Sequence, residues 1–167
     1  MAHRNGSNGA RKEKGMLELK YELLLDFEAE VEQPIPIGST PHGVRMIYNI
    51  KGGIVRGPNV TGVVLPSGAD WLILRPDGAA EVDVRSAIRT DDGEFIYACY
   101  RGIISLPPGV YERIQKGDKV DPSEYYFRTT PVFETGSEKY GWLNGIIAVG
   151  VGQLVPNRVI YKIYRIL

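Results

Sequence analysis

Residues 52–93, GGIVRGPNVTGVVLPSGADWLILRPDGAAEVDVRSAIRTDDG, decide the fold of this chain. Turn signals recur in this stretch about every ten residues, with short β-branched runs between them. They are Gly52-Gly53, Gly57-Pro58, Pro66-Ser67-Gly68, Pro76-Asp77-Gly78 and Asp91-Asp92-Gly93. Glycine tolerates the positive φ angles of tight hairpins, so this spacing predicts successive antiparallel strands.

The same pattern continues on both sides of this stretch. Strands are expected over residues 17–27, 43–50, 54–56, 60–65, 70–75, 79–90, 94–104, 125–135, 142–153 and 159–167. Residues 33–41 have the composition of a turn segment, and 110–116 that of one short helix ended by Gly117. About 8–10 strands with so little helix leave long open edges unless the sheet closes. We therefore predict an all-β antiparallel barrel, with a strongly bent sandwich as the alternative.

Length and charge limit the domain organisation and the partners. The 167 residues fit one domain, taken as residues 16–167. Residues 1–15 carry four cations against Glu13 and are predicted to be a disordered basic tail. The whole chain balances 20 basic against 20 acidic residues, so its body is mildly acidic and nucleic acid is not an expected partner. No secretory signal or apolar run of about 20 residues is present, so we expect a cytoplasmic protein without a membrane partner.

The residues that usually hold metals and cofactors are scarce. His3 and His42 are the only histidines, which disfavours a multi-histidine metal site and a Ser-His-Asp relay. Cys99 is the single cysteine, so no internal disulfide is possible. The pair of glycines in Gly150-Val151-Gly152 lacks the third glycine and the helix of a dinucleotide-binding turn. We expect neither a metal nor an organic cofactor.

Several short strings, in order along the chain, resemble the DUF3237 (UPF0311) family. They are Gly38-Ser39-Thr40-Pro41-His42-Gly43-Val44-Arg45, Gly52-Gly53 with Gly57-Pro58, residues 62–71, Asp83-Val84-Arg85, Asp91-Asp92-Gly93, Tyr126-Phe127-Arg128-Thr129, Phe133-Glu134-Thr135 and Tyr140-Gly141-Trp142-Leu143-Asn144. The resemblance extends from about residue 17 to residue 167. It implies an antiparallel β-barrel that usually self-associates, and it implies no particular activity.

Strand parity divides each predicted strand into two faces and suggests a polar pocket. If the polar faces look into the barrel, Asp83, Arg128 and Glu134 meet there as candidate catalytic residues. The candidate substrate-binding residues around them are His42, Asp70, Trp71, Tyr140, Trp142 and Asn144. A desolvated carboxylate has a raised pKa and suits acid–base chemistry near neutral pH, while the arginine would hold a developing oxyanion.

Each of these residues also has a purely structural interpretation. Asp83, Arg85, Arg128 and Glu134 would serve equally as cross-strand ion pairs on a solvated face. Asp70 would cap the turn after Gly68. The two tryptophans would belong to the core, and His42 to an exposed loop. Parity alone does not decide which face points inward.

These observations leave three functional hypotheses. The first is a cofactor-independent isomerase, lyase or cyclase that binds a small organic, aromatic or polyketide-like substrate in the barrel. The second is a carrier that binds a small molecule without chemistry. The third is a scaffold whose outer face mediates assembly, and all three are compatible with a homo-oligomer, a dimer above all.

Overall fold

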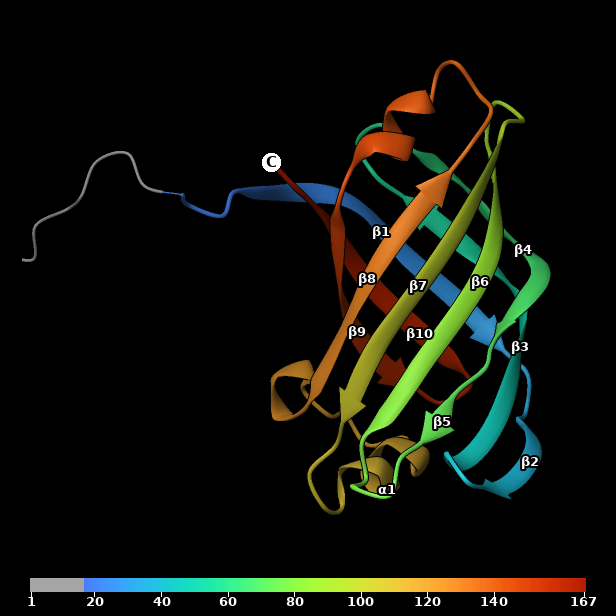
Figure 1. The fold of residues 1–167 in the computed structure, drawn as a ribbon, viewed down its shortest axis with the longest axis vertical. Coiled ribbons are helices and arrows are strands. Elements are labelled where there is room, and N and C mark those ends of the chain that lie inside the picture. The colour runs from blue at the N-terminus through green and yellow to red at the C-terminus, as the bar shows by residue number, and fades with distance from the viewer. Residues whose placement is uncertain (1–16) are drawn as a thin grey trace, which may run out of the picture.

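The computed structural model describes residues 17–167, and the predicted basic tail lies outside the described residues. Ten strands form one antiparallel sheet in the order β1-β10-β9-β8-β7-β6-β4-β3-β2, with β5 at its margin. Strand β1 also pairs with β3, which closes the sheet into a barrel (Figure 1). The predicted all-β barrel is confirmed.

The elements have the following bounds. They are β1 (Tyr21–Val31), β2 (Ile35–Thr40), β3 (Gly43–Arg56), β4 (Thr61–Asp70), β5 (Ile73–Leu74), β6 (Ala80–Thr90), β7 (Phe95–Ser105), α1 (Val110–Gln115), η1 (Pro122–Glu124), β8 (Tyr126–Glu134), η2 (Gly141–Gly145), β9 (Ala148–Val155) and β10 (Arg158–Ile166). None of the helices in residues 17–167 is long and apolar enough to span a membrane.

Four sequence predictions need correction at the level of elements. The turn predicted at Pro66-Ser67-Gly68 lies inside strand β4, where the pairing register with β6 shifts. The segment 33–41 contains strand β2 rather than turn alone, because Ile35–Thr40 pairs with the start of β3. Gly52-Gly53 is no hairpin: it lies inside the long strand β3, where the pairing register shifts. Residues 142–145, predicted as strand, belong to the 3-10 helix η2. The short helix predicted over 110–116 is confirmed as α1.

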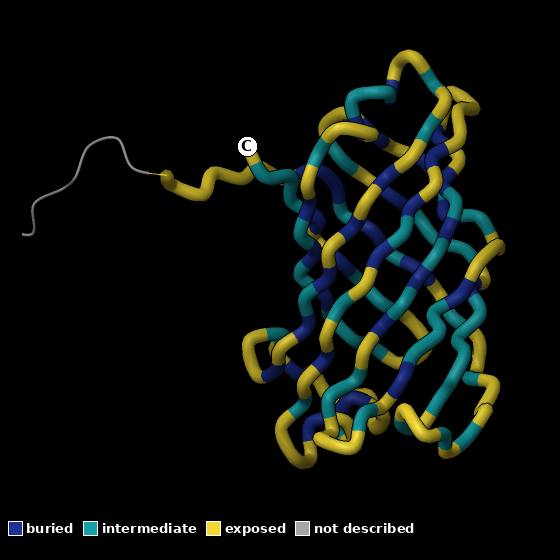
Figure 2. The backbone as a smooth tube through the Cα atoms, in the orientation of Figure 1, coloured by how far each residue is buried: buried dark blue, intermediate teal, exposed yellow. Residues whose placement is uncertain are grey.

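The barrel interior is filled by alternate residues of each strand. In β6, Val82, Val84, Ser86 and Ile88 are buried, while the residues between them retain exposure. Figure 2 shows the same alternation of buried and accessible positions along the strands. Burying the β-branched and aromatic side chains removes apolar surface from water, and this is the main stabilising contribution to the fold.

Short helices lie at the two ends of the barrel (Figure 1). At one end α1 buries Val110 and Ile114 in the core, and Gly117 follows it with a φ of +81°. At the other end η2 buries Leu143, and Trp142 packs against the core. The two ends therefore present different sets of side chains to the interior.

Candidate functional site

The three predicted catalytic residues do not meet in the barrel, because the structure places them on its outer face. Asp83 and Arg128 alternate with the buried residues of β6 and β8, and Glu134 is exposed at the end of β8. The apolar faces of these strands point inward, as burial of hydrophobic surface requires. The expectation that the polar faces enclose a pocket is therefore wrong.

Local partners explain these outer residues. The Asp83 carboxylate accepts a hydrogen bond from Arg85 at 2.9 Å and lies 3.8 Å from Arg101. The Arg128 guanidinium donates to the carbonyl of Phe127 and lies 5.2 Å from the Tyr126 ring centroid. The contacts of Asp83 match its structural interpretation as a surface ion-pair residue, whereas Arg128 contacts a backbone carbonyl and an aromatic ring instead of an acid.

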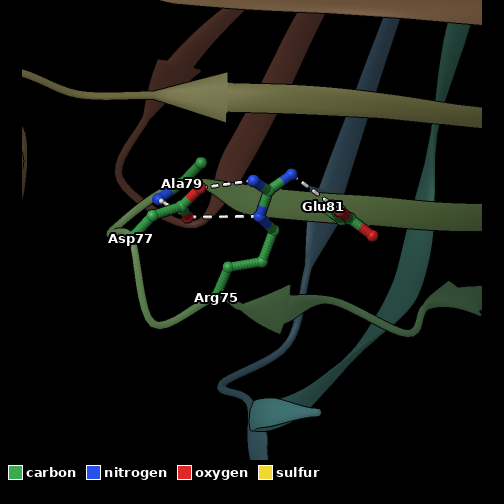
Figure 3. Close-up of polar contacts among 4 residues, drawn as sticks. All are labelled: Arg75, Asp77, Ala79 and Glu81. Carbon is green, nitrogen blue, oxygen red and sulfur yellow. Dashed lines mark hydrogen bonds and ion pairs between the residues drawn. The ribbon is translucent and has the colours of Figure 1, made fainter.

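Figure 3 shows a further ion-pair cluster of this kind, at the turn between β5 and β6. Arg75 bonds to Asp77 and donates a hydrogen bond of 2.9 Å to Glu81, while Asp77 also accepts the Ala79 amide. The side chains are half exposed to solvent, so this cluster organises a turn. It offers no enclosed surface to a ligand.

The six predicted binding residues divide between the two ends. Asp70 is the last residue of β4 and Trp71 follows it, while His42 lies exposed in the β2–β3 turn. Tyr140, Trp142 and Asn144 belong to the η2 region at the opposite end. Asp70 and Trp71 therefore lie together, and Tyr140, Trp142 and Asn144 lie together at the other end.

The residues around η2 have structural partners. The Asn144 side chain accepts the Thr135 amide at 2.8 Å and donates to the Thr135 carbonyl at 3.0 Å, in the manner of a backbone pair. The buried Tyr140 donates its hydroxyl hydrogen to Asp92 at 3.0 Å. Trp142 lies 5.6 Å from the guanidinium carbon of Arg165. A shallow hollow of about 500 Å³ beside Asn144 is lined by Glu134 and Tyr97.

Asp70 is the acidic side chain that the fold turns toward the interior. It lies directly opposite Tyr48 of β3 and Val84 of β6, and Val84 in turn lies opposite Tyr100 of β7. Residues opposite each other in antiparallel strands share a face. Val84 and Tyr100 are buried, so Asp70 and Tyr48 share the inner face of the barrel with them.

Burial makes this carboxyl a weaker acid than an ordinary aspartic acid. Loss of hydration raises the pKa of Asp70 from 3.8 to about 7, and the nearby Asp83 charge adds to the rise. A hydrogen bond of 3.0 Å from the Asp83 amide and the charge of Arg45 act in the opposite direction. Asp70 and Tyr48 nevertheless keep partial exposure. Asp70 does not cap a turn after Gly68, because β4 continues through both residues and its carboxylate accepts the Asp83 amide of β6 instead.

Two buried phenols lie beside Asp70. Tyr100 and Tyr161 pack edge to face with ring centroids 5.5 Å apart. Burial and the charge of Asp70 raise the pKa of Tyr100, while burial, Tyr100 and Asp70 raise that of Tyr161. Both hydroxyls therefore stay protonated at neutral pH.

Further polar groups occupy the inner face. The hydroxyls of Ser86 and Thr129 are buried and have no hydrogen-bond partner among residues 17–167. Opposite Thr129 lies Gly150, where a Cβ atom would come within 2.3 Å of the Thr129 hydroxyl oxygen. Buried hydroxyls without partners are unusual, and each has hydrogen-bonding capacity left for a ligand or water.

Arg45 stands at the edge of this site. Its guanidinium donates a hydrogen bond to the carbonyl oxygen of Trp71, the residue that follows Asp70. Trp71 also lies 5.4 Å from the guanidinium carbon of Arg85. Arg45 therefore holds the chain where β4 ends and contributes positive charge near the acid.

Sequence reasoning named Asp70 and Trp71 but missed Tyr48, Arg45, Tyr100 and Tyr161. These lie singly in apolar strands, so no local motif marks them. The apolar residues at alternate positions of β6 could have identified the inward face of that strand, because apolar side chains are the ones that a barrel buries. No group of three or more potential metal-ligating His, Cys, Asp or Glu side chains exists within residues 17–167.

The fold and this interior define a closed antiparallel β-barrel with the Asp70 carboxyl on its inner face, close to the register positions of Tyr48 and Tyr100. The chain belongs to the family described as protein of unknown function (DUF3237), whose model matches residues 19–166. A UPF0311 protein of Clostridium acetobutylicum is 43% identical over 150 residues, which cover 89% of this chain and 95% of that protein.

Solved structures and a fungal enzyme extend the comparison. The structure of a conserved protein of unknown function from Rhodopseudomonas palustris superposes with a TM-score of 0.86 at 35% identity, covering 91% of this chain and 100% of that one. A hydroalkoxylation enzyme of Penicillium herquei is 29% identical over 108 residues, or 64% of this chain and 56% of the enzyme. The structure of an enzyme from the same fungus shares the fold, with a TM-score of 0.68 at 22% identity and coverage of 92% and 98%.

Proposed function

We propose that the barrel is a cofactor-independent enzyme that adds an O–H group across a carbon–carbon double bond of a small organic substrate, or catalyses the reverse elimination. The observation that carries the proposal is Asp70, an inner-face carboxyl with a pKa raised to about 7 by burial. The distant similarity to a hydroalkoxylation enzyme supports this class of reaction. In this proposal the catalytic acid is Asp70, in place of the residues predicted from the sequence, Asp83, Arg128 and Glu134.

The proposed step balances through one carboxyl group. Protonated Asp70 donates its proton to one alkene carbon, and the π bond breaks as the substrate hydroxyl oxygen bonds to the other carbon. The proton released by that hydroxyl returns to the Asp70 carboxylate. An acid whose pKa is close to the working pH performs both transfers efficiently.

The neighbouring phenols would supply electrostatic stabilisation. If the alkene is conjugated to a carbonyl, negative charge develops on the carbonyl oxygen during addition. We expect Tyr100 and Tyr161, which stay protonated in their buried environment, to donate hydrogen bonds to that oxygen. Donors held in place before the reaction are worth more there than in water.

The test uses 2′-hydroxychalcone, an enone whose internal phenol closes onto its double bond. Asp70→Asn should remove the rate enhancement over the uncatalysed ring closure, with a loss of about 100-fold or more. Glu134→Gln is the matched control, because the same loss of a carboxylate on the exposed outer face should leave turnover intact. A wild-type rate equal to the buffer rate, together with unchanged binding of the chalcone in Asp70→Asn, would favour a carrier and contradict the proposal.

A further inference from the structure

Tyr48 faces Asp70 from the neighbouring strand on the inner face of the barrel. The two residues are directly opposite each other in the pairing of β3 with β4, and both keep partial exposure. Residues opposite each other in antiparallel strands have their Cβ atoms about 4.5–5.5 Å apart. A molecule in contact with the Asp70 carboxyl would therefore lie next to the Tyr48 phenol as well.

The Tyr48 hydroxyl has hydrogen-bonding capacity left for a ligand. It donates to the sulfur of Met46 at 3.8 Å, and a thioether is a weak acceptor. Burial above all, and then the charges of Tyr111 and Asp70, raise the pKa of Tyr48. The phenol therefore stays protonated at neutral pH and is able to donate a hydrogen bond to a substrate oxygen.

A second phenol, Tyr111, lies at the same end of the barrel on the helix α1. Figure 1 shows α1 at the end where β2 and β5 lie, and Asp70 ends β4 just before β5. Tyr111 acts on the pKa of Tyr48, so the two phenols are close to each other. Tyr111 is 51% exposed, so much of this residue is accessible to another molecule.

The helix that carries Tyr111 is fastened to the barrel. Val110 and Ile114 are buried in the core, and the Arg113 guanidinium bonds to the two carboxylate oxygens of Glu124 at 2.5 and 3.3 Å. Tyr111 is therefore presented from an anchored segment. A side chain held in place before binding loses less conformational freedom when it packs against a ligand.

The core next to Asp70 is aromatic as well. The ring of Phe27 lies edge to face with the rings of Tyr100 and Tyr161, at centroid distances of 6.3 and 6.0 Å, and Phe127 lies 5.2 Å from Tyr161. Aromatic rings pack favourably with one another in offset and edge-to-face arrangements. An aromatic substrate at Asp70 would therefore have aromatic neighbours both in the core and on α1.

We propose that Tyr48 and Tyr111, the phenol pair, select aromatic substrates that carry a phenolic hydroxyl. The Tyr48 hydroxyl donates a hydrogen bond to the phenolic oxygen of the substrate, and the Tyr111 ring packs against a substrate ring. The inference rests on the proposed function, because the phenolic oxygen held by Tyr48 is the one that adds to the double bond. Asp70 remains the residue that transfers the proton.

Three ligands without a carbon–carbon double bond to react separate the two contacts. They are 2′-hydroxydihydrochalcone, dihydrochalcone, which lacks the phenolic hydroxyl, and the analogue of dihydrochalcone with both rings saturated to cyclohexyl groups. Titration calorimetry on the full chain should give the lowest dissociation constant for the first. The second should bind about fivefold more weakly, and the third about fivefold more weakly again, although cyclohexyl groups are the more apolar.

Substitutions of the phenol pair assign each preference to one residue. Tyr48→Phe keeps the ring and should abolish the advantage of the phenolic hydroxyl while the preference for aromatic rings remains. Tyr111→Leu should abolish the preference for aromatic rings and keep the advantage of the hydroxyl, and Tyr111→Phe should behave as wild type. Tyr126→Leu is the matched control, because Tyr126 of β8 is also 51% exposed.

Binding of these ligands and turnover are measured separately. Equal binding of the three ligands by the wild type, a Tyr111→Leu variant no different from Tyr126→Leu, or a Tyr48→Phe variant that keeps the hydroxyl advantage would overturn the inference. Each of these results would leave turnover at Asp70 open to its own test. Absence of turnover together with the expected binding pattern would contradict the proposed function and support the binding role of the phenol pair.

Discussion

The Asp70 carboxyl links the proposed chemistry to stability. Its pKa is about 7 in the folded chain and near 3.8 when unfolded, so between these values the folded state holds more protons. Stability from this group is fully present below about pH 4, falls as pH rises toward 7, and stays low above it. The loss amounts to at most about 4 kcal/mol, at 1.36 kcal/mol per unit of pKa.

Asp70→Asn removes this titration while keeping an oxygen that can accept the Asp83 amide. We expect the variant to be more stable than wild type at pH 8 and to lose that advantage at pH 4. Urea unfolding at both values measures the difference. Glu134→Gln, on the exposed outer face, should show no comparable gain at pH 8, and an Asp70→Asn variant equally stable at both values relative to wild type would refute the raised pKa.

The sequence predicts which side chains share a face of a strand, but not which of the two faces points into the barrel. Parity separated Val82, Val84 and Ile88 from Asp83 and Arg85 correctly. The inward face follows from the rule that the interior of a small barrel is packed with apolar side chains. The prediction of an inward polar face, based on carboxylates and arginine on neighbouring strands, went against this rule and was wrong. Asp70 and Tyr100 meet through pairings across β4, β6 and β7, which the sequence does not specify.

At the scale of the element, the strand β4 is shaped by one glycine. Gly68 has a φ of +100°, and a Cβ atom there would lie 2.0 Å from the carbonyl oxygen of Arg85 on β6. The pairing register between β4 and β6 shifts between Val64 and Gly68, just before Asp70. This glycine therefore sets the approach of the two strands that hold the acid.

Gly68→Ala and Gly78→Ala form a matched pair of substitutions. Both positions have positive φ, but Gly78 has no atom within 4 Å of the added Cβ. Gly78→Ala should cost about 1–2 kcal/mol from backbone strain alone, and Gly68→Ala at least about 2 kcal/mol more from the clash. Chemical denaturation measures both, and equal costs would show that the close approach to Arg85 is unimportant.

The turn signals explain why most strand positions could be predicted. Gly78 and Gly93 have φ of +85° and +92° between paired strands, as hairpins require. Gly52 has the same kind of φ, +141°, inside β3 instead. A glycine that permits a bulge and one that permits a turn look alike in sequence, so the long strand β3 was divided in two.

At the scale of the whole molecule, the barrel depends on the seam between β1 and β3. Ala29 lies opposite Gly53 across it, and a Cβ atom on Gly53 would come within 2.0 Å of the Glu28 carbonyl oxygen. Without this seam the sheet would keep its other ladders and expose two long edges. The absence of a side chain at Gly53 is what lets the first and third strands meet.

Gly53→Ala should therefore loosen the seam selectively. We expect amide hydrogen exchange to accelerate in residues 26–31 and 54–56, while β6 and β7, which share ten residue pairs, keep their protection. Gly136→Ala is the control, because a Cβ atom there meets nothing within 4 Å. Equal acceleration in all strands would mean that the barrel opens only by global unfolding and would contradict a selective effect on the seam.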